Sequence, residues 1–203
     1  MEQMHQKKND ESSVRKALLT AGIHLFAEKG YASTSVREIV SLAGVTKPVP
    51  YYYFRNKEGL FKAILDWAAE EQEIILHEAL QAPGTALGRI LHLYRRIYQG
   101  LMENLHLFKL INHLIFGPPQ GAPAYDIERF HRRMKEVIKE IYAGGLPRGE
   151  VRRINPEEAA FLVLGVTDYC FHLDYLHPES IDPDRAERLL RIAFQGLSER
   201  KDG

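Results

Sequence analysis

The sequence predicts an all-α protein of about nine helices, with an N-terminal three-helix domain over residues 1–62 and a C-terminal helical bundle over residues 63–203. Two observations support this fold class. Apolar residues recur at intervals of three and four, and no segment shows the alternation of a half-buried strand. Capping residues, glycines and prolines separate the periodic segments. The 203 residues are enough for one medium domain or two small ones.

The first predicted helix has one apolar face. Ser12 or Ser13 is expected to cap its start, and Gly30 is expected to end it in the left-handed conformation. The residues of that face are Val14, Ala17, Leu18, Ala21, Gly22, Leu25 and Phe26.

The second helix opens with the capping box Ser35-Val36-Arg37-Glu38, in which the serine and the glutamate satisfy each other's free backbone N–H groups. Val36, Ile39, Val40 and Ala43 are expected on its buried side, and Gly44 permits a sharp turn after it.

The third helix contains two prolines. Thr46 is expected to cap it, which puts Pro48 in the first turn, where a missing N–H costs little. Pro50 follows two residues later, so we expect an irregular start with a 3₁₀ turn. At least one of Tyr52 and Phe54 is expected in the core.

Asn56 is expected to cap a fourth helix over residues 57–80, which would be about 35 Å long and could link two domains. Further helices are predicted over 86–103, 105–116 and 124–142, with loops over 117–123 and 144–149. One more runs from the cap Asn155 to Leu176, apolar nearly all round, and the last starts near Asp182. Two short helices around a tight turn, followed by a long helix, are typical of a helix-turn-helix DNA reader.

Composition is that of an ordinary globular protein, with 45% hydrophobic and 27% charged residues. The net charge of +0 conceals an asymmetry: residues 1–62 carry ten Lys and Arg against six Asp and Glu, and the remainder seventeen against twenty-one. The helix-turn-helix end is therefore suited to phosphate. No apolar run is long enough to cross a membrane and no signal peptide is evident, so we expect a cytoplasmic protein with no membrane partner.

Several motifs stand in fixed order: LFAEKGY at 25–31, TSVREI at 34–39, GVTKPVPYYYF at 44–54 and NKEGLF at 56–61. Over roughly Val14 to Leu65 the chain closely resembles the N-terminal domain of the TetR family of bacterial transcriptional regulators. The remainder resembles the family only in its helical layout. The resemblance implies a homodimer that binds a double-stranded DNA operator and a small-molecule effector. Family members commonly carry an apolar, helix-compatible residue in place of Pro50; this departure leaves the motif intact and the fine docking geometry open.

The resemblance also assigns residues to DNA. The start of the second helix should meet phosphate, the third helix should enter the major groove, and the fourth should begin at a phosphate. Lys47, Pro48 and Val49 would face the bases, and Arg55 would add a phosphate contact. The assigned set is Thr34, Ser35, Thr46, Lys47, Pro48, Val49, Tyr51, Tyr53 and Lys57.

Polar groups among apolar residues in the C-terminal part indicate a small-molecule pocket, although any one of them could be a satisfied core side chain. The candidates are Tyr94, Tyr98, Asn112, His113, Asp168, Tyr169 and His172. The last two helices are expected to pair with those of a second subunit, with small residues Ala159, Ala160 and Gly165 allowing close approach.

The resulting hypothesis is a repressor that binds a palindromic operator as a dimer and is released by a small, largely apolar effector. Alternatives are a helical partner-binding protein or a metal or redox sensor on the same fold. Asp168 and His172 share a helix face, but zinc needs three or four ligands, and Cys170 has no neighbouring cation to activate it. No phosphate loop or nucleophile elbow is present, so neither catalysis nor a metal or cofactor is expected.

Overall fold

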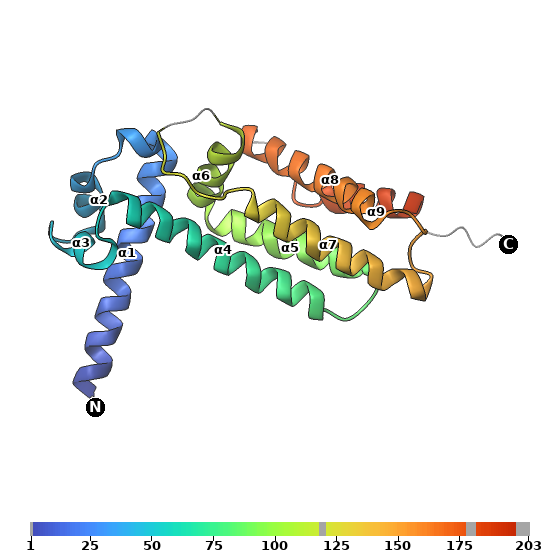
Figure 1. Cartoon of the computed structure of the whole chain (residues 1–203), viewed down its shortest axis with the longest axis horizontal. Coiled ribbons are helices and arrows are strands. Elements are labelled where there is room, and N and C mark those ends of the chain that lie inside the picture. Colours follow the sequence, from blue (N-terminus) through green and yellow to red (C-terminus); the bar gives the residue numbers. More distant parts are fainter. Residues whose placement is uncertain (1, 118–120, 178–181, 198–203) are drawn as a thin grey trace. The chain divides into compact units, whose positions relative to one another are not determined.

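The computed structural model describes residues 2–117, 121–177 and 182–197, with side chains described between Ser12 and Gly196 (Figure 1). Within these ranges every regular element is a helix, as predicted. The elements are α1 (Glu2–Ser33), α2 (Val36–Ala43), α3 (Val49–Phe54), α4 (Lys57–Gln81), α5 (Ala86–Glu103), α6 (Leu105–Phe116), α7 (Arg129–Gly145), the 3₁₀ helix η1 (Leu146–Arg148), α8 (Pro156–Leu176) and α9 (Arg185–Leu197).

The chain forms two compact units. Unit 1 comprises Met1–Glu70 and Asn104–Ile127, and unit 2 comprises Glu71–Glu103 and Glu128–Gly203. The helix α4 runs from one unit into the other, and α6 belongs to unit 1 although its place in the sequence falls within the predicted C-terminal bundle.

Unit 1 is built around α1, which packs against both α2 and α6. Its core contains Leu18, Phe26, Phe61 and Ile64, all with at most 1% of their surface exposed. Gly30 interrupts α1 at φ 77°, which confirms the predicted stop. The predicted cap at Ser12 or Ser13 is wrong, because α1 already begins at Glu2.

The start of α7 also differs from the prediction, since residues 124–128 are not helical. Tyr125 and Ile127 pack against the core of unit 1, and the Tyr125 hydroxyl donates to Asp66 at 2.9 Å. These tertiary contacts hold the segment in an irregular conformation although its apolar spacing fits a helix.

Unit 2 contains the C-terminal part of α4, the 3₁₀ helix η1 and four complete α-helices, of which α5 and α8 each contact α7 and α9. Helices α7, α8 and α9 lie side by side in Figure 1. Asn155 caps α8 by accepting from the Glu157 N–H at 3.0 Å, with Pro156 in the first position, as predicted. Fully buried side chains such as Ile138, Tyr142 and Leu190 form the core. None of the described helices is long and apolar enough to cross a membrane.

Candidate nucleic-acid interface and effector cavity

The turn between α2 and α3 is set by three local features. The capping box of α2 is present, with the Ser35 hydroxyl accepting from the Glu38 N–H at 3.2 Å. Gly44 ends α2 in the left-handed region at φ 66°. The Val49 N–H donates to the Thr46 carbonyl at 3.1 Å, which is a 3₁₀-type turn of the kind expected from the prolines.

The recognition helix α3 begins at Val49, with Pro48 at its N-cap and no side-chain cap. The prediction that Thr46 caps this helix is therefore wrong. Pro50 occupies the second helical position, where a backbone N–H would have no intrahelical partner, so the proline is tolerated. It is buried, and it does not interrupt the helix.

A strained turn joins α3 to α4. Arg55 is the one non-glycine residue of the described chain with positive φ, at 64° with ψ −44°. The Asn56 N–H donates to the Phe54 carbonyl at 2.8 Å, which closes a γ-turn around Arg55. A Cβ on Gly59 would lie 1.9 Å from the same carbonyl oxygen, so only glycine fits there. The Asn56 side chain caps α4 by accepting from the Gly59 N–H at 2.7 Å, as predicted.

One face of α3 is open to solvent. Tyr51 and Tyr52 are 47% and 76% exposed, and Lys47 and Pro48 before them are also exposed. Phe54 is buried in the unit 1 core, whereas Tyr53 and Val49 are half-buried against it. Sequence reasoning missed Tyr52, because four consecutive aromatic residues give no sign of which one points outward.

The structure corrects the expected role of Thr34. Its side chain is only 2% exposed, and its hydroxyl donates inward to the carbonyls of Leu25 and Gly30. Its N–H donates to the Tyr31 carbonyl at 3.2 Å. Neither donor is therefore left for a phosphate.

At Ser35 a carboxylate already occupies the helix start. Both the N–H and the hydroxyl of Ser35 donate to Glu38 Oε2 at 2.9 Å. A hydrogen bond from Lys29, followed by those from Ser35, lowers the pKa of Glu38 to about 2. The start of α2 thus binds an anion in the manner of a phosphate site, with the anion supplied by the chain itself.

Lys57 is also held within the protein. Its Nζ donates to the carbonyls of Tyr31 and Thr34, each at 2.9 Å, and lies 4.1 Å from the centre of the Tyr31 ring. Two of its three N–H groups are used, so this ammonium joins the end of α1 to the start of α4.

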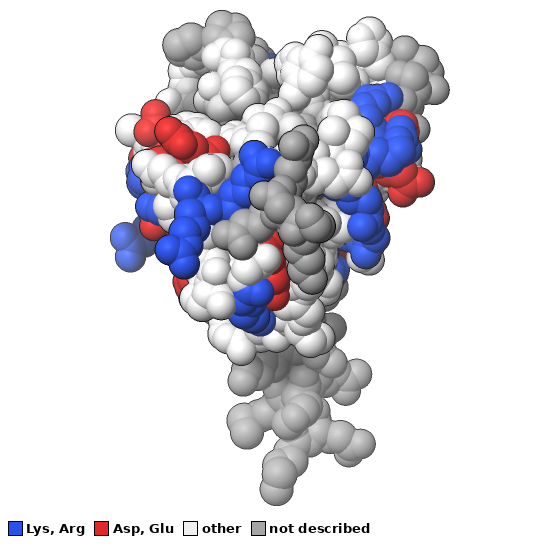
Figure 2. Space-filling model, turned by 90° about the vertical axis from the view of Figure 1, so that its right-hand side faces the viewer, with Lys and Arg blue, Asp and Glu red and all other residues white. Residues whose placement is uncertain are grey.

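The cations of the helix-turn-helix region fall into two groups. Lys29 and Lys62 form ion pairs with Glu38 and Glu58. The exposed cations that make no ion pair within the described part of the chain are Arg15, Lys16, Arg37, Lys47 and Arg55. By contrast, the face seen in Figure 2 carries its basic residues in separated groups with acidic residues beside several of them. The unpaired cations give the helix-turn-helix region a local charge that suits a polyanion.

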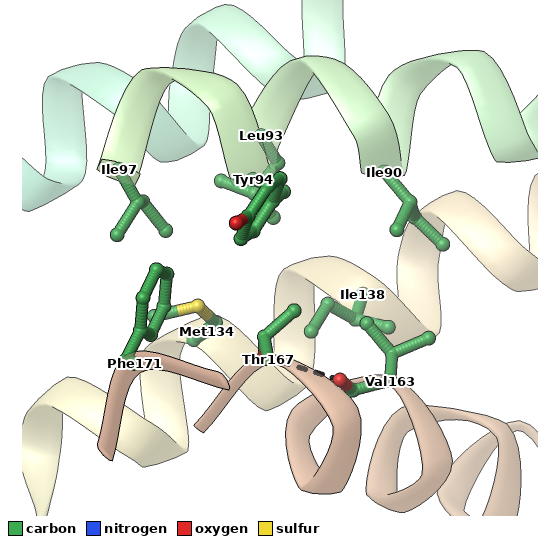
Figure 3. A pocket seen from close by; sticks show the side chains of 9 residues that line it. All are labelled: Ile90, Leu93, Tyr94, Ile97, Met134, Ile138, Val163, Thr167 and Phe171. Carbon is green, nitrogen blue, oxygen red and sulfur yellow. Dashed lines mark hydrogen bonds between the residues drawn. The ribbon is translucent and has the colours of Figure 1, made fainter. Parts of the chain in front are cut away.

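A small cavity lies inside unit 2 between α5, α7 and α8 (Figure 3). Its free volume of about 10 Å³ is room for about one water molecule at most. The polar atoms of the lining are occupied, since the Thr167 hydroxyl donates to Val163 and the Tyr94 hydroxyl donates to Pro183. The lining residues are Ile90, Leu93, Tyr94, Ile97, Met134, Ile138, Val163, Thr167 and Phe171.

Among the predicted effector residues, Tyr94 lines this cavity and the Tyr98 ring lies 5.7 Å from the Tyr94 ring. The others are not part of the lining. Asn112 and His113 lie on α6 in unit 1, and Tyr169 is 62% exposed. His172 is half-buried on α8. The remaining lining residues were missed because apolar cavity walls and ordinary core have the same sequence pattern.

Asp168 has a partner on α7 rather than on its own helix. Its Oδ2 lies 3.2 Å from Nε2 of His131, and this hydrogen bond raises the pKa of His131 against the opposing effect of burial. Among the described residues, no three His, Cys, Asp or Glu side chains come together as a metal site would require. Cys170 is buried, and burial raises the pKa of its thiol, so it is a poor nucleophile.

A stripe of exposed apolar side chains follows α8 and α9. We call it the apolar stripe; it consists of Phe161, Leu162, Tyr169, Leu176, Leu189 and Ile192. The residues of α8 recur at helical intervals on the side opposite the core, and Gly165 is exposed among them. Ala159 and Ala160 are fully buried inside the unit, so the expectation that they lie between subunits is wrong.

A three-helix domain with an open recognition helix, joined to a helical bundle, defines a helix-turn-helix DNA-binding regulator of transcription. Residues 18–64, which hold the helix-turn-helix, are of the TetR type: they match the family described as bacterial regulatory proteins, tetR family.

Relatives match over longer stretches. The chain is 25% identical to the HTH-type transcriptional regulator RutR of Escherichia coli, over 93% of this chain and 92% of that protein. It is 26% identical to the HTH-type transcriptional repressor ComR of Escherichia coli, over 68% and 67% of the two chains. The crystal structure of NalD, the secondary repressor of the MexAB-OprM multidrug efflux pump in Pseudomonas aeruginosa, is 26% identical with a TM-score of 0.70, over 96% of this chain and 100% of that one.

Proposed function

We propose that this regulator is a dimeric repressor that binds a palindromic operator through α2 and α3 and is released by a small, largely apolar effector. The observation that carries the proposal is the open face of α3, where Lys47, Tyr51 and Tyr52 are exposed while Phe54 anchors the helix in the core. Neighbouring exposed aromatic side chains form the kind of apolar patch that marks an interaction site. The repressor activity named for ComR and NalD supports the sign of regulation.

In this proposal Lys47 donates to guanine, and Pro48 and Val49 pack on thymine methyl groups. Tyr51, with Thr46 and Tyr53 at the edges, contacts the phosphate backbone, whereas both donors of Ser35 are used on Glu38. Lys57 acts differently from the other cations, because its two carbonyl contacts make it a positioning residue for the start of α4.

The apolar stripe on α8 and α9 supports a homodimer. Six large apolar side chains, each at least 40% exposed, lie on these two helices, and two helices from each subunit would form a four-helix bundle. A dimer reads two half-sites about 34–36 Å apart, which strengthens the weak binding of a single domain.

The small size of the cavity provides a mechanism by which effector binding releases the protein from its operator. A ligand much larger than one water molecule must separate α5 from α7 or α8 to enter. Helix α5 continues through Asn104 into α6, and α6 packs against α1 of the DNA-binding unit. Helix α4 provides a second continuous connection. A shift of either helix would change the spacing of the recognition helices, so that effector and operator would weaken each other's binding.

The test is selection of binding sites from random duplex DNA by the purified chain at near-physiological salt. We expect an enriched palindrome that is lost in Tyr51→Ala and retained in Ile74→Ala, which alters an exposed apolar side chain on α4. A folded protein that enriches no sequence would contradict the proposal. Unchanged operator affinity in the presence of a saturating cavity ligand would refute the release mechanism alone.

A further inference from the structure

A polar cluster adjoins the apolar cavity. The Tyr98 ring lies 5.7 Å from Tyr94 and 6.2 Å from Phe171, and these two residues belong to the cavity lining. Asp174 follows Phe171 by about one turn of α8. Burial, and then the charge of Asp174, raise the pKa of Tyr98 to about 12, so its hydroxyl remains protonated and able to donate.

Two polar atoms of this cluster have no partner in the described chain: the Tyr98 hydroxyl and Asp174 Oδ2. Both residues are more than nine-tenths buried, with 8% and 5% of their surface exposed. The neighbouring groups are satisfied, since the Tyr94 hydroxyl donates to Pro183 and Asp174 Oδ1 accepts from Arg185 at 3.3 Å. The Tyr98 hydroxyl lies close enough to Asp174 for that carboxylate to raise its pKa, yet neither buried atom makes a hydrogen bond of acceptable geometry, which is destabilising unless something else binds them.

The chemistry of the two atoms limits what can bind there. A hydroxyl group can donate to Asp174 Oδ2 and accept from Tyr98 with one oxygen atom. The charge of Asp174 is already matched by Arg185, so a cation is not required. The rings of Tyr94 and Phe171 are stacked at 5.6 Å and 18°, which favours a flat aromatic body beside them.

We propose that the effector is an uncharged aromatic molecule carrying a hydroxyl group, whose ring enters the apolar cavity while its hydroxyl bonds Tyr98 and Asp174. This inference rests on the proposed effector-release function. The flexible side chain of Met134 and the packing of α5 against α7 are the parts that must yield to admit the ring.

The test compares two probes on the full chain by calorimetric titration: 2-naphthol, and 2-methoxynaphthalene, which lacks the donor. We expect wild type to bind 2-naphthol about tenfold more tightly or better, as a hydrogen bond to a charged group would give. Tyr98→Phe and Asp174→Asn should each remove most of that preference. Tyr142→Phe is the matched control, because its buried hydroxyl already donates to Arg152 at 2.8 Å and is not part of the cavity.

Thermal unfolding without ligand gives a second readout. Tyr98→Phe should keep or raise Tm, because the hydroxyl it removes has no partner, whereas Tyr142→Phe should lower it. Equal affinity for the two probes, or no binding of either, would overturn the inference. So would a Tm of Tyr98→Phe that falls as far as that of Tyr142→Phe, which would mean that an ordered water alone satisfies the site.

Selection of DNA sites with the same preparation distinguishes failure of the proposed effector class from failure of the proposed DNA-binding function. An enriched palindrome without a hydroxyl preference overturns only the effector class. Absence of a palindrome overturns the proposed function, whatever the probes do.

Discussion

The ammonium of Lys57 lies 4.1 Å from the centre of the Tyr31 ring and donates to the Tyr31 carbonyl at 2.9 Å. With the second bond to Thr34, this contact joins the start of α4 to the end of α1 and to the link that precedes α2. The residue that the family pattern assigns to phosphate is therefore also an internal support of the domain.

Substitutions of Lys57 and Lys47 distinguish a lysine that stabilises the fold from one that contacts DNA. Lys57→Met should lower the free energy of unfolding by about 1–3 kcal/mol, because charged hydrogen bonds are lost, and leave the salt dependence of DNA affinity unchanged. Lys47→Met should leave stability unchanged and reduce the slope of log affinity against log salt by about 0.9. Denaturant titration and binding at several salt concentrations test both, and the reverse pattern would refute the assignment.

Two aromatic residues of α3, Tyr52 and Phe54, should respond in opposite ways to replacement by alanine. Tyr52→Ala should change stability by less than about 0.5 kcal/mol and weaken operator binding about tenfold, because the side chain is 76% exposed. Phe54→Ala should cost about 3–5 kcal/mol, because the ring is in the core. Thermal unfolding and a binding assay distinguish the two effects, and full operator affinity in Tyr52→Ala would remove it from the interface.

Replacement of two glycines by alanine should change the free energy of unfolding in opposite directions. Gly59→Ala should cost about 3 kcal/mol or more, because its Cβ would lie 1.9 Å from the Phe54 carbonyl. Gly100→Ala, in α5 with nothing within 4 Å of the new Cβ, should stabilise the protein by about 0.5–1 kcal/mol. Calorimetry measures both, and a tolerated Gly59→Ala would mean that the turn at Arg55 is not rigid.

The apolar stripe predicts the oligomeric state. Ile192→Glu should convert the dimer to a monomer and weaken binding to a two-half-site operator on the order of 100-fold, because the linked second half-site is lost. Ile74→Glu, at a similarly exposed side chain outside the stripe, should have neither effect. Sedimentation equilibrium gives the masses, and a dimeric Ile192→Glu would place the interface elsewhere.

The His131–Asp168 pair predicts a pH dependence. The pKa of His131 is raised in the folded protein, so the pair contributes stability that is complete below the unfolded pKa of about 6.5 and is lost as pH rises through the folded pKa. Asp168→Asn should therefore destabilise the protein more at pH 5.5 than at pH 9. Denaturant titration at the two pH values measures this difference, which should disappear in a His131→Gln background.

Local signals predicted the caps at Ser35, Asn56 and Asn155, because each depends on residues within one helical turn. The same kind of signal gave wrong predictions for the caps at Ser12 or Ser13 and at Thr46, and for the first residue of α7. At α7 the packing of Tyr125 and Ile127 onto unit 1 outweighed the apolar spacing. The cavity could not be predicted for a similar reason. Met134 and Phe171 have the sequence pattern of ordinary core residues, and only the packing of α5, α7 and α8 places them in a cavity wall.

The sequence by itself determined the all-helical fold, the order of the elements and the helix-turn-helix domain, since periodicity, capping and the motifs over 25–61 are local properties. Only the tertiary structure decided which side chains are free to act. In the folded chain Tyr52 points outward and Thr34 inward, and Lys57 donates to two carbonyls. The Tyr98 hydroxyl and Asp174 Oδ2 are buried without hydrogen-bond partners among the described residues. Burial and hydrogen-bond satisfaction depend on residues distant in sequence, and for that reason the spacing of residues cannot reveal them.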